Sequence, residues 1–180
     1  MARGLNKVMV IGFVGRDPEL RRTARGQAVA TFSLSARRSW TTNAGEPRAS
    51  TEWFNVVVWG MLAEAADQTV RKGQRIYAQG HLQTRTWENA GGQRQVRTEV
   101  VADQLIPMDS HGTVVAGHPQ PEEANLPLCL NRVMVIGNLG RNPEMRYTPG
   151  GQAITSFSLA ATRTWTTASG DRRDATEWFN

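Results

Sequence analysis

The chain has 180 residues, 39% hydrophobic and 21% charged, a composition typical of a globular protein rather than a collagenous or broadly disordered one. It has no run of about 18 apolar residues that could span a membrane, and its start lacks the apolar core of a signal peptide, so we expect a cytoplasmic protein. The single Cys129 excludes an intramolecular disulfide framework, and the net charge of +5, supplied almost wholly by arginine, predicts a polyanionic partner unless it is only a solvated surface.

The first half of the chain begins with strand patterns. Val8–Val14 is β-branched and bounded by glycines, which predicts a strand with a bend or bulge at Gly12. Residues 16–26 are polar and turn-like, and the alternation of residues 29–36 predicts a half-buried strand. Residues 39–50 contain asparagine, glycine and proline and are expected to form a loop.

A short helix is predicted among the strands that follow. Residues 51–59 alternate and predict another strand. Over residues 61–72 the apolar positions recur every four residues, which indicates an amphipathic helix that ends at Gly73. Residues 75–86 and 95–106 alternate again and predict two strands joined by a hairpin loop.

The order β-β-β-α-β-β within about 106 residues points to one mainly β architecture. It matches the OB-fold, a five-stranded Greek-key barrel with one helix between strands three and four. An open five-stranded sheet with one covering helix is the alternative. Gly12 and Gly80 fall inside strands, where glycine often marks a tight barrel corner, and therefore favour the barrel.

The chain also repeats itself. Residues 5–55 and 130–180 align without a gap, and roughly 31 of the 51 aligned positions are identical. This unit exceeds a solenoid period of about 20–50 residues, so it indicates a duplicated domain. We therefore expect a complete domain over residues 1–106, a loose Pro- and Gly-containing linker over 107–129, and the first half of a second copy over 130–180. The second copy ends in mid-strand, which favours truncation.

Residues that would support catalysis or hold a cofactor are not grouped in the sequence. Phosphate-binding glycine loops and nucleophile motifs are absent. The three histidines, His81, His111 and His118, are scattered, and two of them lie in the expected linker, which argues against a metal site. We expect a protein that is not an enzyme, with no metal and no cofactor.

Tryptophans interleaved with arginines are the informative pattern. Trp53 and Trp59 share one face of their predicted strand, and the aliphatic face opposite suits a narrow barrel core better, so both indoles are expected to point outward. Trp40 and Trp87 lie at loop ends beside arginines. Exposed indoles can stack on unpaired bases while cations follow the phosphates, which indicates single-stranded nucleic acid. A core role for each tryptophan is the alternative.

The first copy resembles the bacterial single-stranded DNA-binding proteins over its whole length. The motifs that carry the resemblance are Leu5-Asn6-Lys7-Val8, Gly15-Arg16-Asp17-Pro18-Glu19-Leu20-Arg21, Thr51-Glu52-Trp53-Phe54, Leu62-Ala63-Glu64, Arg71-Lys72-Gly73 and Arg85-Thr86-Trp87. The resemblance implies an OB-fold that binds single-stranded DNA with little sequence preference in replication, recombination and repair, at the nucleoid.

The resemblance also implies a set of binding residues. Stacking aromatics are expected at Trp40, Trp53, Trp59 and Trp87, and the repeat adds Trp165 and Trp178. Backbone contacts are expected from Arg3, Lys7, Arg21, Arg37, Arg38, Arg48, Arg71 with its neighbour Lys72, and Arg85.

Partners follow from the same resemblance. Family members form tetramers of single-fold chains or dimers of two-fold chains, so a homo-oligomer without a membrane partner is expected. The acidic, Phe-terminated tail of the family has no counterpart before Asn180, so partners recruited by that tail are not expected. Two other readings remain open: an RNA-binding OB module, and an assembly module whose indoles form subunit interfaces.

Overall fold

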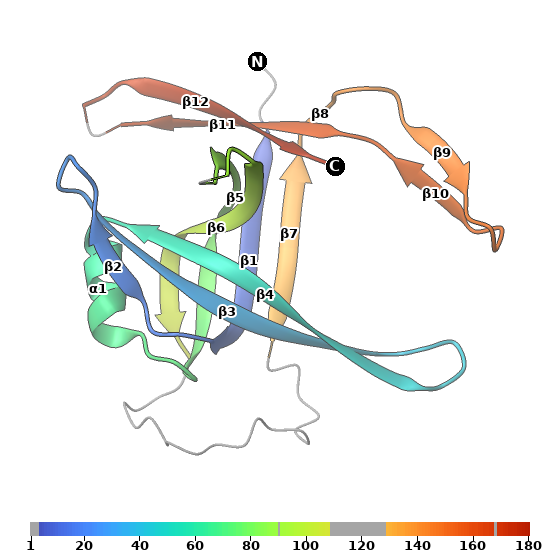
Figure 1. Ribbon diagram of the computed structural model, residues 1–180, viewed down its shortest axis with the longest axis horizontal. Coiled ribbons are helices and arrows are strands. Elements are labelled where there is room, and N and C mark those ends of the chain that lie inside the picture. The colour runs from blue at the N-terminus through green and yellow to red at the C-terminus, as the bar shows by residue number, and fades with distance from the viewer. Residues whose placement is uncertain (1–3, 90, 109–128, 168) are drawn as a thin grey trace.

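The computed structural model describes residues 4–89, 91–108, 129–167 and 169–180 (Figure 1). Arg3, the histidines His111 and His118, and nearly all of the expected linker lie outside the described residues. Within the described part of the chain, no helix has the length and apolar character needed to cross a membrane.

The first copy forms a closed barrel. Its elements are β1 (Leu5–Val14), β2 (Glu19–Arg22), β3 (Ala28–Thr41), β4 (Pro47–Trp59), α1 (Met61–Thr69), β5 (Arg75–Glu88) and β6 (Arg94–Pro107). Antiparallel pairs join β1 to β3 and β5, β3 to β4, and β5 to β6, and a parallel pair between β4 and β6 closes the ring. The predicted OB-fold is therefore confirmed, and the open-sheet alternative is wrong.

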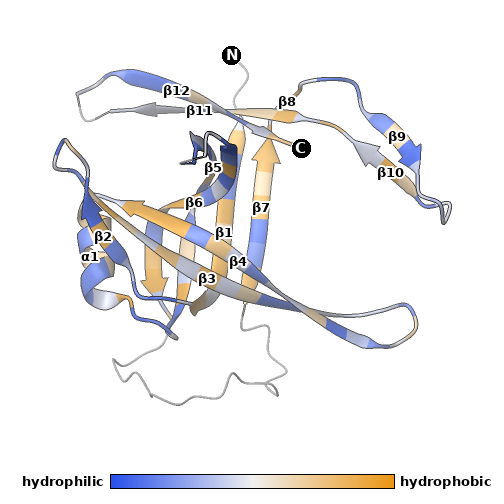
Figure 2. Cartoon of the chain, viewed as in Figure 1, coloured by the Kyte–Doolittle hydropathy of each residue, from blue (hydrophilic) through white to orange (hydrophobic). Residues whose placement is uncertain are grey.

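Alternation along the strands fills the barrel. Every second side chain is buried in β1 and over residues 28–34 of β3, and β4 buries the consecutive Val56, Val57 and Val58 near its end. The buried side chains include Val8, Val10, Phe32, Leu34, Val56, Val58, Ile76 and Val100. Ala63 and Ala66 of α1 are buried with this core. Figure 2 shows the hydrophobic residues on barrel strands such as β1 and β4, whereas β2 is hydrophilic.

Two glycines allow the barrel strands to approach each other closely. The β5–β6 register shifts between Gln79 and Gly80, and a Cβ on Gly80 would lie 2.0 Å from the carbonyl oxygen of Val101. A Cβ on Gly12 would lie 2.3 Å from the carbonyl oxygen of Ser35, where β1 meets β3. Neither contact could hold a side chain, which explains glycine inside both strands.

Three details of the predicted elements are wrong. Residues 39–50 are not a loop, because β3 and β4 continue in register as far as the Thr41–Pro47 pair, and the amide of Thr42 donates to the carbonyl of Glu46 across a short turn. The polar segment 16–26 contains the short strand β2, which pairs with β3. The predicted helix 61–72 ends at Thr69, because Val70 already has extended backbone angles.

The second copy repeats the order of the first, with the counterparts of β1 and of β3 each divided into two strands. Its elements are β7 (Leu130–Ile136), β8 (Asn138–Leu139), β9 (Glu144–Tyr147), β10 (Ala153–Ser156), β11 (Leu159–Thr166) and β12 (Arg172–Phe179). The β9–β10 and β11–β12 registers are those of β2–β3 and β3–β4 in the first copy. Val133, Ile136, Ile154 and Phe157 are exposed, as expected for half a barrel, whereas Phe179 is half-buried.

The two copies meet along their first strands. β7 pairs antiparallel with β1 from the Leu5–Ile136 pair to the Ile11–Leu130 pair. Val8 faces Val133, its own counterpart in the repeat, so the pairing is two-fold symmetric about that point. The hairpin of β11 and β12 then lies across the end of β5 (Figure 1).

Candidate nucleic-acid interface

All six tryptophans of the chain are exposed. The exposed fractions are 42% for Trp40, 61% for Trp53, 37% for Trp59, 43% for Trp87, 37% for Trp165 and 57% for Trp178. The opposite face of β4 supplies the buried Val56 and Val58, so the outward orientation predicted for Trp53 and Trp59 is confirmed. Six large indoles on the surface of one small protein indicate a binding surface.

Trp53 has a defined seat on the barrel wall. A Cβ on Gly15 would lie 2.4 Å from Cζ3 of the Trp53 ring and 2.7 Å from Oγ of Ser33. The indole therefore lies directly over a position that has no side chain. In the second copy Trp178 lies over Gly140 in the same way, with 2.3 Å between the corresponding positions. This placement of the indole over a glycine is thus a property of the repeat unit, and it holds the ring against the barrel wall while most of the residue stays exposed.

Trp40 lies on the long β3–β4 hairpin among arginines. The guanidinium carbon of Arg38 is 5.5 Å from the centroid of its ring, within the range of a cation–π contact. Arg48 is its register partner on β4, and Arg37 and Arg38 occupy the same arm of the hairpin. This arm was expected to be a loop. As a paired ribbon it holds the basic residues at a fixed spacing.

Trp87 lies on the β5–β6 hairpin beside an arginine that is not among the contacts expected from the sequence. The guanidinium carbon of Arg97 is 5.6 Å from the Trp87 ring. Arg97 is also the register partner of Arg85, whose guanidinium is 3.8 Å from Glu99. Strand alternation across the hairpin was the signal available for Arg97, because it places residues 85, 87, 95 and 97 on one side.

Several of the expected basic residues already have partners in the fold. Arg21 pairs with Glu19, which holds the pKa of that carboxyl below its usual value, and Arg48 pairs with Glu46 at 2.9 Å. These two ion pairs are exposed and contribute little stability, so breaking them to bind another anion costs little free energy. Lys7 lies on β1 opposite Met134 and is half-buried.

Arg71 has a different setting from the other expected contacts. Its guanidinium donates to the carbonyl oxygens of Asp67, Gln68 and Val70 at 2.7, 3.0 and 2.8 Å. It therefore caps the C-terminal end of α1, where helix carbonyls lack backbone partners. Lys72, its neighbour, donates its backbone N–H to the Asp17 carboxylate at 2.7 Å.

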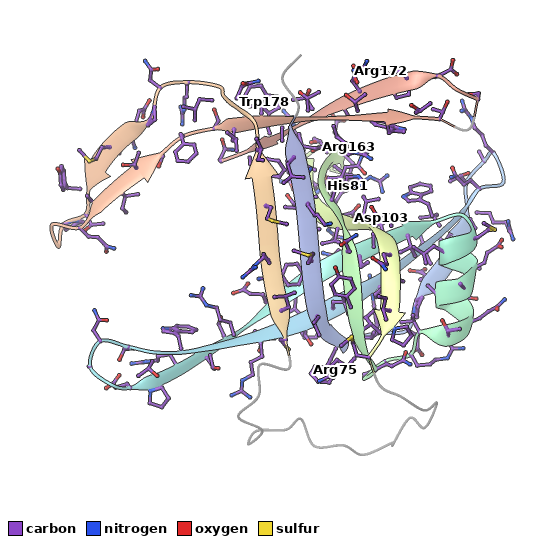
Figure 3. The ribbon with its side chains drawn as sticks, turned by 180° about the vertical axis from the view of Figure 1, so that it is seen from behind. Arg75, His81, Asp103, Arg163, Arg172 and Trp178 are labelled. Atoms are coloured by element: carbon purple, nitrogen blue, oxygen red, sulfur yellow. The ribbon has the colours of Figure 1, made fainter. Side chains whose placement is uncertain are left out.

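The second copy brings its own tryptophan–arginine pair against the first. The guanidinium of Arg163 is 4.4 Å from the ring centroid of Trp165, closer than either pair in the first copy. Arg163 also lies near His81 and Asp103 of the first copy (Figure 3). Burial, followed by the Arg163 charge, lowers the pKa of His81, and Asp103 opposes that effect.

The described segments contain no group of side chains suited to binding a metal ion. There, no three or more His, Cys, Asp or Glu side chains are grouped so that they could hold an ion. Half-buried His81 lies near Asp103 and Arg163, which do not make up such a group.

A closed OB barrel with exposed tryptophans beside arginines defines the class of OB-fold binding proteins. Residues 5–108 and 130–180 match the family described as the single-strand binding protein family, and the chain belongs to that family.

Sequence relatives agree with this assignment. The chain is 44% identical over 106 residues to single-stranded DNA-binding protein 1 of Chlorobaculum tepidum, covering 58% of this chain and 65% of that protein. It is 35% identical over 162 residues to the single-stranded DNA-binding protein of Thermus aquaticus, covering 89% of this chain and 60% of that one. The chain thus spans less than two thirds of the length of these relatives.

Solved structures show the same fold. A crystal structure of a deletion mutant of the Thermus aquaticus protein superposes with a TM-score of 0.71 at 30% identity, covering 99% of this chain and 77% of that chain. A Plasmodium falciparum SSB complex with ssDNA superposes with a TM-score of 0.57 at 36% identity, covering 61% of this chain and 99% of that chain.

Proposed function

We propose that this protein binds single-stranded DNA without sequence preference and holds it open and protected. The observation that carries the proposal is the exposure of all six tryptophans, four on the closed OB barrel and two on the second copy, three of them with an arginine over the ring. Relatives named single-stranded DNA-binding proteins, and a similar structure described as a complex with ssDNA, support this choice of ligand.

In the proposed mechanism, bases stack on the indoles and arginines follow the phosphates. Stacking contributes about 1–3 kcal/mol per base and tolerates any sequence, because every base has a flat face. Paired bases in a duplex do not present those faces. The proposed stacking residues are Trp40, Trp53, Trp59, Trp87, Trp165 and Trp178, and the proposed phosphate contacts are Arg3, Lys7, Arg21, Arg37, Arg38, Arg48, Arg85 and Arg97. Arg71 remains a candidate that competes with its role at the end of α1.

A wider role follows from the proposed ligand. We propose a passive binding protein of replication, recombination and repair, located in the cytoplasm at the nucleoid and acting as a homo-oligomer, either a tetramer or a dimer of two-fold chains. The proposed division of the chain is one complete OB domain over 1–106, a linker over 107–129 and half a repeat over 130–180. The two segments that match the family, 5–108 and 130–180, support this division.

The proposal is tested by tryptophan fluorescence during titration with single-stranded oligo-dT. Parallel titrations use duplex DNA, oligo-U and a series of salt concentrations. We expect strong quenching by oligo-dT, weak quenching by duplex, and an affinity that falls with salt as phosphate counterions are released. Stronger quenching by oligo-U would identify an RNA-binding module. Absent quenching together with oligomers in sedimentation would identify an assembly module.

A further inference from the structure

One side chain of the second copy binds the backbone of the first. The carboxylate Oε2 of Glu177 in β12 accepts a hydrogen bond from the backbone N–H of Thr84 in β5 at 3.0 Å, and the contact is partly buried. It joins residues that are 93 positions apart. The edge of β5 at this point needs an acceptor, because the pairing between β1 and β5 ends at the Val8–Gly80 pair.

Another residue on the same edge of β5 also has its backbone N–H and carbonyl bound by a side chain. The side chain of Asn6 donates to the carbonyl of Leu82 at 2.8 Å and accepts from its N–H at 3.0 Å. Thr84 is the next residue whose N–H points to this edge, because strand residues alternate. Asn6 of the first copy therefore binds the backbone groups of Leu82 at this edge, and Glu177 of the second copy binds the N–H of Thr84.

The repeat supplies an internal comparison for Glu177. Glu52 is its counterpart in the first copy, within the same Thr-Glu-Trp-Phe-Asn motif. Glu52 is exposed and pairs with the hydroxyl of Ser50 on its own strand at 3.4 Å. The bond to Thr84 thus comes from the way the second copy is placed, not from the motif itself.

Other contacts hold the same hairpin against the first copy. Arg163 of β11 is half-buried and is attracted by the carboxylates of Glu177 and Asp103. Figure 3 shows Arg163 and His81 close together where the hairpin crosses β5. A Cβ on Gly4 would lie 2.6 Å from the backbone nitrogen of Thr162, so β11 passes directly over the start of β1.

We propose that Glu177 is a positioning residue for DNA binding, which fixes the tryptophans of the second copy relative to those of the first. Glu177 directly precedes Trp178, and Thr84 lies three residues before Trp87 on the same strand. Their bond holds the hairpin with Trp165 and Trp178 beside the β5–β6 hairpin with Trp87. One strand of DNA can then run from one copy to the other. This inference rests on the proposed function.

The test compares short and long oligonucleotides. An oligo-dT of about 10 nucleotides fits one OB fold, whereas one of about 30 nucleotides can reach both copies. The measured quantity is the ratio of the two affinities for each full-length variant, so that changes common to both lengths cancel. Glu177→Ala removes the acceptor, Glu177→Gln keeps an acceptor oxygen, and Glu52→Ala is the matched control. Amide hydrogen exchange at Thr84 reports the bond itself.

We expect E177A to lower the long-to-short ratio about tenfold, as for the loss of a hydrogen bond to a charged group, and to speed exchange at Thr84. We expect E177Q to restore most of the affinity ratio and most of the protection from exchange at Thr84. We expect E52A to leave the ratio and the exchange rate unchanged. An unchanged ratio in E177A despite faster exchange overturns the inference, as does an equal loss in E52A. If the unmodified chain binds neither oligonucleotide, the proposed function fails first and the inference fails with it.

Discussion

The indole of Trp53 shows how a single residue can be held at a surface without being part of the core. It is 61% exposed and lies over Gly15, on the strand face opposite Val56 and Val58. Its substitution should therefore affect binding far more than folding. Experiment can therefore distinguish an exposed stacking residue from a core residue.

Replacing Trp53 with alanine should weaken binding of single-stranded DNA by about 5- to 150-fold, which corresponds to one stacked base at ~1–3 kcal/mol. The midpoint of thermal unfolding should change little. Fluorescence or anisotropy titration and a thermal melt measure the two effects. If W53A unfolds the domain, the indole is part of the core and its stacking role is wrong. The same comparison applies to Trp87→Ala.

Gly15→Ala should weaken binding with the indole still present. The new Cβ would lie 2.4 Å from the Trp53 ring, so the indole must move. We expect an affinity loss of about tenfold, smaller than the largest loss expected for W53A. Gly150→Ala is the control, because its Cβ would meet only Thr148 Oγ1, at an ordinary 3.8 Å. Equal affinities for G15A and the unmodified chain would show that the ring's position is unimportant.

At the scale of elements, the end of α1 gives one of the expected phosphate contacts a second, structural role. Arg71 has the charge and position expected of a phosphate contact, yet it donates to three carbonyls at the end of α1. Arg48 on the β3–β4 hairpin pairs with Glu46 at 2.9 Å, and both side chains are exposed. The two arginines should therefore respond differently to substitution.

Arg71→Ala should lower the free energy of unfolding by about 1 kcal/mol, through the loss of the helix cap. Its effect on the slope of DNA affinity against salt should be small. Arg48→Ala should do the reverse, reducing the salt slope by about one phosphate contact while leaving stability nearly unchanged. Chemical denaturation and salt titrations measure both. A reduced salt slope in R71A with unchanged stability would return Arg71 to the DNA contacts.

Elements that depend on local pattern were predicted well. Alternation identified the barrel strands and oriented the tryptophans, because a narrow barrel accepts only one face of each strand. Residues 39–50 misled the prediction, since Asn43 and Gly45 are turn residues that here serve one short hairpin turn, while Pro47 already begins β4. The Glu177–Thr84 bond could not be predicted, because it depends on how two distant segments pack. The contact of Arg97 with Trp87 could be predicted only from the register of the β5–β6 hairpin.

At the scale of the whole molecule, the contact between the copies contains a titratable group. The pKa of His81 is lowered from 6.5 by burial first and by Arg163 second, with Asp103 opposing. In the unfolded chain this imidazole takes up its proton near 6.5, before the folded chain does. Folding stability from this group is therefore complete above pH 6.5 and is lost as pH falls toward the lower, folded-state pKa.

His81→Gln should remove that part of the pH dependence. We expect the thermal midpoint of the unmodified chain to fall more steeply than that of H81Q as pH drops below 6.5, because a protonated His81 would be half-buried and would also face Arg163. Thermal melts across this window, with both proteins in the same buffers, measure the difference. Parallel curves would show that His81 does not contribute.

The symmetric pairing of β1 with β7 has a consequence for how this protein can change. In a dimer of identical chains, every substitution at such a contact occurs on both sides at once, and the contact weakens on dilution. Here both strands belong to one polypeptide, so their effective concentration does not depend on how much protein is present. Lys7 faces Met134, while Met9 faces Arg132. Lys7 and Arg132 occupy equivalent positions in the two copies, so the basic residue at this position already differs between them. Each half of the contact can therefore evolve separately while the contact persists.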